Sequence, residues 1–327
     1  SNSVLVHEVG PIPASVLSES NDDIPMGAAV DADGTLWFSP GISGPMIRVT
    51  PQGFFSTVDS PARTFTGISL RPGTGEVWTV EAPDIAEGAT GTARLRRFTG
   101  LADATGESFD TGSHFASHAA WINENEFWMT DSFHGVVLVN AAMLEAGVEY
   151  EHAIELRFPA ILDAIFLAAD PLTGDAVSAD ALRQNLFFLH RDGSSETVAA
   201  SAVPLFRDAL GVFWVASVSP SGFFRGLSAD PAGRTGVRVD LLTGGRTSYD
   251  WTTGGAWALS QYPPGLYRFA EDGSVLREVP AIRVAGEGAD RSFETFSNLR
   301  VAPDATWGAV SYNGNDIARG IYALDLL

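Results

Sequence analysis

The sequence predicts an all-β protein, a seven-bladed β-propeller of four-stranded antiparallel blades that forms a single domain over residues 1–327. Two observations predict it. A short pattern of strands recurs along the chain, and the 34 glycines and 18 prolines fall in clusters between apolar runs. Such clusters are typical of many short strands joined by tight turns. A ring of six blades is the alternative.

The repeat is visible around the tryptophans. Residues 26–58 contain an apolar strand, a turn, a strand that carries Trp37, and two further strands, which together make one antiparallel meander. The same order returns at six later positions, centred on Trp78, Trp128, Val177, Trp214, Trp257 and Trp307. Successive copies are about 40 to 50 residues apart, the length of a propeller blade. We expect each tryptophan to fill the gap between neighbouring blades.

The two ends of the chain are expected to complete one blade. The last strand, Gly320 to Asp325, lacks a fourth partner within its own repeat, and the apolar run from Val4 to Val9 belongs to no repeat. A closed ring shields strand edges that a row of open sheets would expose. The sequence therefore predicts that the ring is closed by pairing of the N- and C-terminal strands.

Acidic residues outnumber basic ones by two to one. The chain has 40 Asp and Glu against 20 basic residues, all of them Arg, which gives a formal net charge of -20. A surface of this sign repels phosphate backbones and anionic headgroups, and no apolar run reaches the roughly 18 residues that span a bilayer. We therefore expect no nucleic-acid partner and no membrane insertion. We expect a monomer that binds a small molecule.

The composition excludes some chemistry and bears on location. With no Cys, the chain has no disulfide framework, no thiolate metal site and no cysteine nucleophile. Ser1 and Asn2 indicate either a mature start or an added remnant. A signal peptide removed before them would place the protein in the periplasm or outside the cell.

One arginine cluster and one long loop also stand out. Arg94, Arg96 and Arg97 alternate along an expected strand, and we expect them on a solvated strand with one arginine turned inward. The segment from Glu81 to Thr92 is rich in Gly, Ala and acidic residues and is expected to form a surface loop.

Short motifs resemble two known propeller families. Residues 31–39, DADGTLWFS, and 46–53, MIRVTPQG, are similar to the repeat of virginiamycin B lyase-type propellers. Residues 129–140, MTDSFHGVVLVN, and 297–307, SNLRVAPDATW, resemble signatures of the SMP-30/gluconolactonase-like superfamily. The second resemblance implies a divalent metal, commonly calcium, held at the axis by Glu, Asn and Asp side chains, and hydrolysis of a lactone or ester.

The chain also departs from both families. The early glutamate that the superfamily resemblance implies has no counterpart at residues 24–27, IPMG. The lyase resemblance implies a late pair of histidines and a glutamate, but no histidine follows His190. Asn298 stands where the superfamily resemblance implies an asparagine ligand, and with Asp163 and Asp208 it makes the candidate metal set.

The candidate site lies where the inner strands of the blades begin, because these strands converge on the propeller axis. His118 and Asp163 are the candidate catalytic residues, since an imidazole titrates near neutrality and a carboxylate in an apolar run needs a partner or a function. A backbone-bonded histidine and a turn-capping aspartate are the structural alternatives. The candidate substrate-binding residues are Thr66, Ser117, Asp250, Trp251 and Ser297.

Three functions fit these residues. The first is a metal-dependent hydrolase of a lactone or ester, in which the cation polarises the carbonyl group. The second is a metal-free isomerase, cyclase or lyase, in which His118 and Asp163 orient the substrate and move its protons. The third is a propeller that binds a partner without catalysis. A cation with six or seven oxygen ligands at the axis would favour the first.

Overall fold

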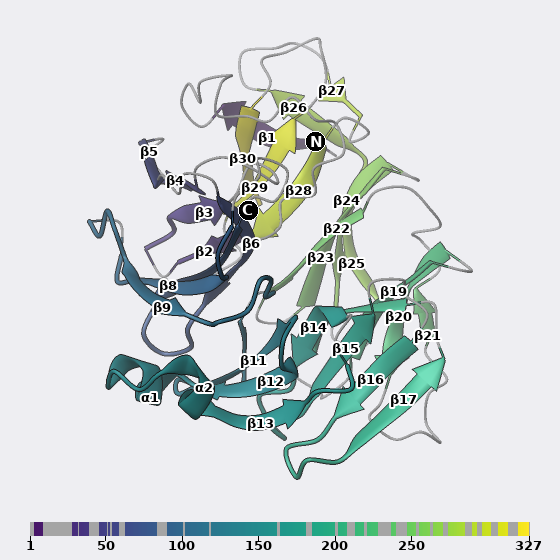
Figure 1. Cartoon of the computed structure of the whole chain (residues 1–327). Helices are drawn as coiled ribbons and strands as arrows, with labels where there is room; N and C mark the ends of the chain where they lie inside the picture. Colours follow the sequence, from purple (N-terminus) through teal and green to yellow (C-terminus); the bar gives the residue numbers. More distant parts are fainter. Residues whose placement is uncertain are drawn as a thin grey trace.

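The computed structural model has its strands arranged as sheets around a common centre (Figure 1). The residues that it describes are 3–8, 28–31, 33–38, 46–50, 52, 54–58, 63–83, 90–100, 102–117, 119–161, 164–180, 185–199, 202–207, 213–218, 221–227, 237–239, 247–252, 255–261, 264–270, 274–284, 290–292, 296–301, 307–312 and 320–326.

Six of the sheets are four-stranded antiparallel meanders, in which each strand pairs with the next along the chain. Sheet 1 consists of β2 (Ala28–Val30), β3 (Leu36–Phe38), β4 (Met46–Val49) and β5 (Phe55–Val58). Sheet 2 consists of β6 (Arg63–Leu70), β7 (Val77–Pro83), β8 (Arg94–Phe98) and β9 (Glu107–Asp110). Sheet 3 consists of β10 (Ala120–Trp121), β11 (Glu126–Asp131), β12 (Gly135–Asn140) and β13 (Ile154–Phe158).

Two short helices, α1 (Ala141–Glu145) and α2 (Tyr150–Ala153), connect β12 to β13. Sheet 4 consists of β14 (Ala164–Ala169), β15 (Ala176–Asp180), β16 (Asn185–Leu189) and β17 (Ser195–Ala199). Sheet 5 consists of β18 (Ala202–Arg207), β19 (Phe213–Val218), β20 (Ser221–Leu227) and β21 (Val237–Val239). Sheet 6 consists of β22 (Thr247–Thr252), β23 (Gly255–Gln261), β24 (Pro264–Phe269) and β25 (Val275–Val279).

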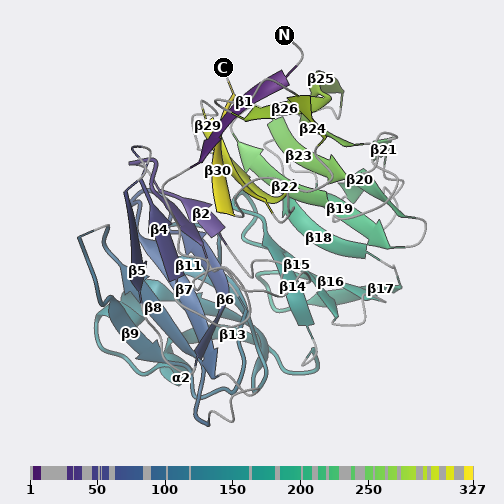
Figure 2. The same cartoon turned by 90° about the horizontal axis from the view of Figure 1, so that it is seen from above.

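The closing sheet differs from the other six. It has six strands in the order β27 (Asp290–Arg291), β26 (Ala281–Val284), β1 (Ser3–Glu8), β30 (Gly320–Asp325), β29 (Trp307–Tyr312) and β28 (Phe296–Val301). β1 pairs with β30 antiparallel, Val6 opposite Leu324, so the predicted pairing of the two chain ends is confirmed. Figure 2 shows β1 beside both β26 and β30.

The expected ring of equal four-stranded antiparallel blades, seven or six in number, is therefore wrong. The closing sheet has six strands, and β1 pairs with β26 in parallel, Ser3 opposite Ala281. A parallel pair needs no hairpin, so no turn between the two strands marks it in the sequence. The repeat predicted the meanders but could not predict these additional strands.

Four of the repeat tryptophans occupy the spaces between sheets, as predicted. Trp37, Trp78, Trp128 and Trp257 are almost completely buried, whereas Trp307 is only partly buried. Trp128, for example, packs against Leu167 and Ala176 of sheet 4. A substitution of such a tryptophan by alanine costs about 3–5 kcal/mol, because it removes a large apolar side chain and leaves a cavity.

A second feature of the repeat was not predicted from the sequence. In four of the sheets an arginine of the third strand lies directly opposite the tryptophan of the second strand. These pairs are Trp37 with Arg48, Trp78 with Arg97, Trp214 with Arg225, and Trp257 with Arg268. The guanidinium of Arg48 lies 5.3 Å from the Trp37 ring centroid and that of Arg268 lies 5.5 Å from the Trp257 ring centroid. Each is within cation–π distance.

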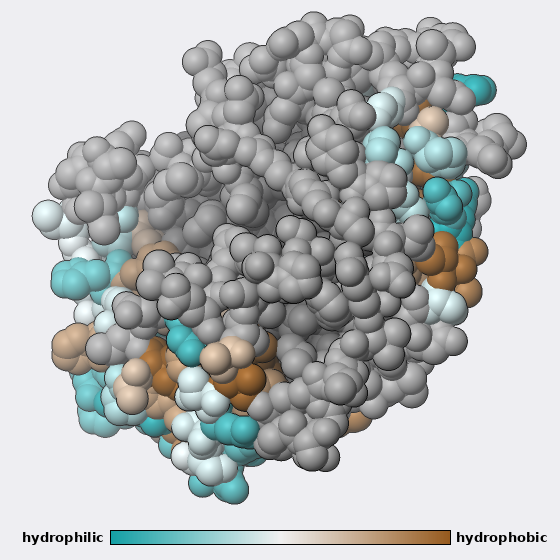
Figure 3. Space-filling model, turned by 90° about the vertical axis from the view of Figure 1, so that its right-hand side faces the viewer, coloured by the Kyte–Doolittle hydropathy of each residue, from teal (hydrophilic) through white to brown (hydrophobic). Residues whose placement is uncertain are grey.

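On the side shown in Figure 3, hydrophilic and hydrophobic residues are mixed in the coloured parts of the surface. Of the helices described, none is long and apolar enough to cross a membrane.

Candidate functional site

Two faces of the ring are distinguished by the direction of the inner strands, β2, β6, β10, β14, β18, β22 and β28. Because the sheets repeat one up-and-down order around the centre, these strands begin at one face and end at the other. We call the first the start face and the second, which carries the turns that follow the inner strands, the hairpin face. Contacts fix this direction for adjacent sheets: Nε1 of Trp128 donates to the carbonyl oxygen of Gly174, in the turn that follows β14.

Four of the predicted residues stand at or shortly before the beginning of an inner strand in the sequence. His118 and Asp163 lie outside the described residues; β10 begins two residues after His118, at Ala120, and β14 begins directly after Asp163, at Ala164. Ser297 and Asn298 are the second and third residues of β28, with side chains outside those described. The strands β10 and β14 are neighbours in the ring.

Other predicted residues do not begin an inner strand. Thr66 lies inside β6, at the point where the pairing with β7 shifts register. Asp250 and Trp251 lie in the second half of β22, opposite Trp257 and Ala256 and next to the β22–β23 turn, and the side chains of all three predicted residues are outside those described. The alternation of polar and apolar residues predicted the strands here but not which end of each strand a polar residue occupies.

The predicted metal ligand Asp208 also fails to begin a strand. It lies outside the described residues, and β18 already ends at Arg207, so Asp208 follows the inner strand of its sheet. Of the predicted metal ligands, only Asp163 and Asn298 then stand near the beginning of an inner strand in the sequence. Calcium usually binds about six to eight oxygen ligands. In the part of the chain that the structure describes, no three His, Asp or Glu side chains are grouped so as to hold a metal ion.

Ser117, a predicted substrate-binding residue, is buried and bonded to β11. Its backbone N–H donates to the carbonyl oxygen of Thr130 at 2.9 Å, and its Oγ accepts from the backbone N–H of Thr130 at 3.0 Å. These bonds fix the backbone of Ser117 against β11.

A buried polar cluster lies beside Ser117 at the end of β11. The side chain of Asp131, which is fully buried, accepts hydrogen bonds from Nδ1 of His134 and the hydroxyl of Tyr150, both at 3.0 Å, and from Oγ of Ser113. It also accepts from the backbone N–H groups of Phe133 and His134 at 2.8 and 3.1 Å. We call Ser113, Asp131, His134 and Tyr150 the start-face cluster.

The hydrogen bonds of the start-face cluster fix the tautomer of His134. A carboxylate only accepts hydrogen bonds, so in the neutral form of the ring Nδ1 carries the proton and Nε2 is an acceptor. Burial, together with the nearby charge of Asp131, raises the pKa of the Tyr150 hydroxyl well above its usual value. Tyr150 therefore keeps its proton and donates it to Asp131.

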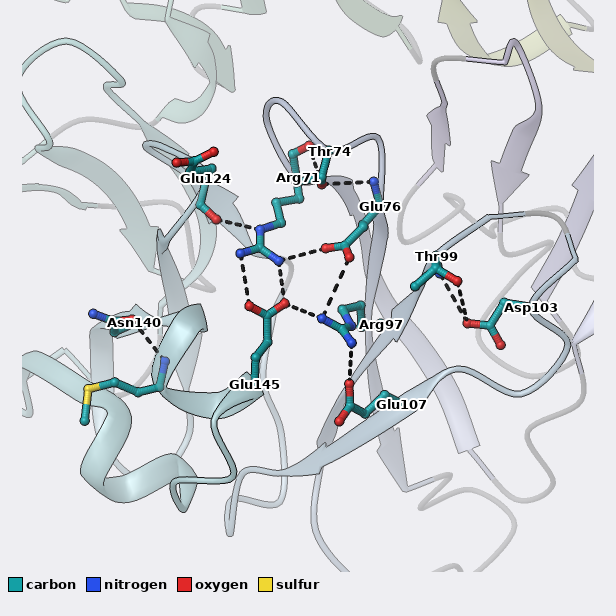
Figure 4. A network of polar contacts seen from close by, with 11 residues as sticks. Arg71, Thr74, Glu76, Arg97, Thr99, Asp103, Glu107, Glu124, Asn140 and Glu145 are labelled. Atoms are coloured by element: carbon teal, nitrogen blue, oxygen red, sulfur yellow. Dashed lines mark hydrogen bonds and ion pairs between the residues drawn. The ribbon is translucent and has the colours of Figure 1, made fainter.

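A different polar network occupies the hairpin face between sheets 2 and 3 (Figure 4). The Arg71 guanidinium, at the end of β6, donates to Glu145 of α1 at 2.5 Å and to Glu76 at 2.8 Å. Arg97 pairs with Glu145 as well and with Glu107 at 2.6 Å. We call Arg71, Glu76, Arg97, Glu107 and Glu145 the hairpin-face network.

The arginines of β8 are paired rather than solvated, which corrects the sequence-based expectation. Arg94 and Arg96 donate to the two carboxylate oxygens of Glu81 at 2.5 and 2.9 Å, and Arg97 points to the hairpin-face network. Glu81 belongs to β7, not to a surface loop, and its side chain is fully buried. Its neighbours Val80 and Ala82 are apolar, so the run VWTVEAP was the available sign of a buried strand.

The comparisons with known proteins support the fold. No protein-family model matches the chain, and the curated proteins give no match. Virginiamycin B lyase from Staphylococcus aureus matches with a TM-score of 0.60 and 10% identity, over 95% of this chain and 97% of that one. YCF48 from Cyanidioschyzon merolae matches with a TM-score of 0.58 and 13% identity, over 98% of both chains.

A third similar structure is the extracellular domain of the putative hybrid two component system BT4673 from B. thetaiotaomicron, with a TM-score of 0.60 and 12% identity. This chain is covered over 96% of its length and spans 42% of that one. The ring of antiparallel meanders and these matches together define the protein as a β-propeller. The predicted likeness to lyase-type propellers is supported at the level of fold, and the likeness to SMP-30/gluconolactonase-like proteins is not shown.

Sequence reasoning missed the start-face cluster although one signal was present. Asp131, His134 and Gly135 all lie in the motif at residues 129–140, which was used for the superfamily resemblance and not to place a site at these residues. Tyr150 is 19 residues away on α2 and Ser113 is 18 residues away on the other side, so no local spacing joins them to Asp131.

Proposed function

We propose that this propeller is a metal-independent enzyme that acts on a small organic molecule at the start face by general acid–base catalysis. The observation that carries the proposal is that β10 and β14 are neighbouring inner strands and that, in the sequence, His118 stands two residues before β10 and Asp163 one residue before β14. An imidazole and a carboxylate at adjacent strand starts suit removal of a proton from one substrate atom and its return to another. This chemistry corresponds to an isomerase, cyclase or lyase.

The calcium-dependent lactone or ester hydrolase receives less support. It needs Asp208 at the axis together with Asp163 and Asn298, whereas β18 ends before Asp208. Two donors from the chain would leave most of a calcium ion's six to eight positions to water. One of the structural neighbours is a lyase by name, and the name bears neither on a metal nor on these residues.

The roles proposed for the residues follow from their chemistry. His118 is the general base, because a neutral imidazole accepts a proton at neutral pH. Asp163 orients the imidazole or returns the proton. Ser297 and Asn298, at the start of β28, supply hydrogen-bonding groups for the substrate.

The test follows the mass of a product. The chain is incubated with quinupristin, which is present in one of the solved structures of virginiamycin B lyase, and with δ-valerolactone, and products are separated by liquid chromatography and mass spectrometry. Elimination or isomerisation leaves the mass unchanged, and hydrolysis adds one water. We expect ring opening of quinupristin without a change in mass, unaffected by EDTA. His118→Asn and Asp163→Asn should lower the rate by about 10²- to 10⁴-fold.

A matched variant controls for effects on the fold. His152→Asn alters an exposed histidine of α2 and should leave the rate unchanged. Loss of activity on chelation would contradict the metal-free mechanism. Absence of turnover with both probes, in a chain that melts cooperatively, would contradict the enzymatic function and favour a binding propeller; a structure titled as YCF48 bound to D1 peptide shows that such a neighbour exists.

A further inference from the structure

One nitrogen of the start-face cluster is buried without a hydrogen-bond partner. Nδ1 of His134 is held by Asp131 at 3.0 Å, whereas Nε2 of the same ring is enclosed and bonds to nothing. The side chain of His134 is only 6% exposed. Buried polar atoms are nearly always satisfied, and leaving one without a partner is unfavourable. Nε2 is therefore an acceptor that the folded chain supplies and does not use.

The residue before His134 has the opposite character. Phe133 is 72% exposed, and its ring meets the His134 ring edge-on, with 4.9 Å between the centroids and an angle of 87°. It is the one large exposed apolar residue of the described chain that lies on a turn of the start face, since Phe54 and Leu172 lie on hairpin-face turns and Val275 and Leu276 on β25. The Phe133 side chain can turn away from His134 without disturbing the core.

The turn that carries both residues is rigid. Asp131 accepts from the backbone N–H groups of Phe133 and His134, and Gly135 closes the turn with φ of +86°. A Cβ atom at residue 135 would lie 2.1 Å from the carbonyl oxygen of Phe158, so only glycine fits. The backbone of Phe133 and His134 is therefore held in place on the start face, and only the exposed Phe133 side chain can move.

We propose that the β11–β12 turn, residues 131–135, is the ligand-recognition element of the start face. Phe133 packs against an aromatic or flat apolar group of the ligand, and Nε2 of His134 accepts a hydrogen bond from an N–H or O–H group of the same ligand. The ligand class is a small aromatic molecule with one hydrogen-bond donor. This inference rests on the proposed function for the identity of the site and adds the class of molecule that the site takes.

The sheet 4 turn that begins at Asp170 offers a matched control. Asp170 accepts from the backbone N–H groups of Leu172 and Thr173, as Asp131 does from its own turn, and Leu172 is 75% exposed. This turn lies on the hairpin face and has no histidine. Leu172→Ala thus removes an exposed apolar side chain from an equivalent turn far from the proposed site.

The test uses indole, which has an aromatic ring and one N–H donor, and 1-methylindole, which lacks the donor. Binding is measured by ligand-observed NMR on the full chain. We expect indole to bind about two- to tenfold more tightly than 1-methylindole. Phe133→Ala should weaken the binding of both by about three- to tenfold, and Leu172→Ala should not change it.

The variant His134→Asn tests the contribution of the Nε2 acceptor alone. The asparagine amide retains a donor to Asp131 but has no atom at the position of Nε2. It should abolish the preference for indole while leaving 1-methylindole binding unchanged. In the unaltered chain, indole should shift the ¹⁵N resonance of Nε2.

Three results would overturn the inference: no saturable binding of indole, equal effects of Phe133→Ala and Leu172→Ala, or a preference for indole that survives in His134→Asn. The proposed enzyme function is tested separately by turnover. Turnover that depends on His118 without indole binding would contradict the ligand class alone. Indole binding that depends on Phe133 without turnover of any probe would contradict the enzyme function alone.

Discussion

The start-face cluster and the hairpin-face network lie at opposite faces of sheets 2 and 3, and their charges are balanced by different kinds of partner. In the hairpin-face network Arg71 contacts two carboxylates, Arg97 contacts three, and Glu145 accepts from both arginines. In the start-face cluster one carboxylate, Asp131, accepts from Ser113, His134, Tyr150 and two backbone amides, and Nε2 of His134 has no partner. Nε of Arg97 is also buried without a partner, so the two regions differ in how charge is balanced: two arginines share three carboxylates in the network, whereas one carboxylate collects several donors in the cluster.

The largest effect is expected at the centre of the start-face cluster. Asp131→Ala leaves Tyr150, Ser113 and His134 without their common acceptor inside the protein, and we expect a loss of about 3–5 kcal/mol in the free energy of unfolding. Chemical denaturation followed by tryptophan fluorescence measures it. Asp170→Ala, in the equivalent sheet 4 turn, should cost only about 1 kcal/mol, because its turn is partly exposed. Equal losses in the two variants would show that Asp131 acts only as a turn former.

A smaller, pH-dependent effect is expected in the hairpin-face network. Burial alone would raise the pKa of Glu145, but its hydrogen bonds and charge interactions with Arg71 and Arg97 outweigh burial and lower that pKa. A lowered folded-state pKa stabilises the protein above the unfolded value of about 4.3, and this contribution is lost as the pH falls through the folded pKa. We expect Glu145→Gln to cost about 2 kcal/mol at pH 7.

Denaturation of both proteins across the acidic range measures this difference, which should close as the pH falls below that of a free glutamate. Glu151→Gln alters an exposed pair with Arg157 and should change stability by less than about 0.5 kcal/mol. A cost of Glu145→Gln that stays constant down to acidic pH would mean that shape and not charge links α1 to sheet 2.

The smallest effect is expected at Tyr150. Tyr150→Phe removes one neutral donor from Asp131 and keeps the ring, so we expect a loss of about 1 kcal/mol. Because the pKa of Tyr150 is raised, its hydroxyl should stay protonated when ordinary tyrosines ionise near pH 10. Ultraviolet titration of the folded protein and of Tyr150→Phe should therefore give the same number of ionising tyrosines in this range. One fewer in the variant would contradict the predicted raised pKa.

The sequence predicted the meanders and their order because each needs only residues close together in the chain. A turn with Asp or Gly, a strand with alternating apolar residues and a large ring on the second strand recur every 40 to 50 residues or so. Trp37, Trp78, Trp128 and Trp257 are buried for this reason. The parallel pairing of β1 with β26 was not predicted, because these two strands lie far apart along the chain. The pair β26–β27 was also not predicted, although its strands are close in the chain.

For the candidate site, the sequence predicted residue types better than their positions. His118 and Asp163 precede inner strands as expected, whereas Asp208 follows one and Asp250 lies deep within another. Polar residues flank strands at both ends, and the two ends of a strand have the same local pattern, so the sequence could not tell which face each residue would reach.

Local pattern and composition by themselves determined that this chain forms antiparallel meanders with buried tryptophans, carries a strongly acidic charge and lacks thiol chemistry. Only the tertiary structure decided that Glu81 is buried between Arg94 and Arg96, that Tyr150 and Ser113 meet at Asp131, and that Nε2 of His134 is left without a partner. The physical reason is that burial and hydrogen bonding are settled by neighbours brought together when the sheets close around the centre, and these neighbours leave no periodic trace in the sequence.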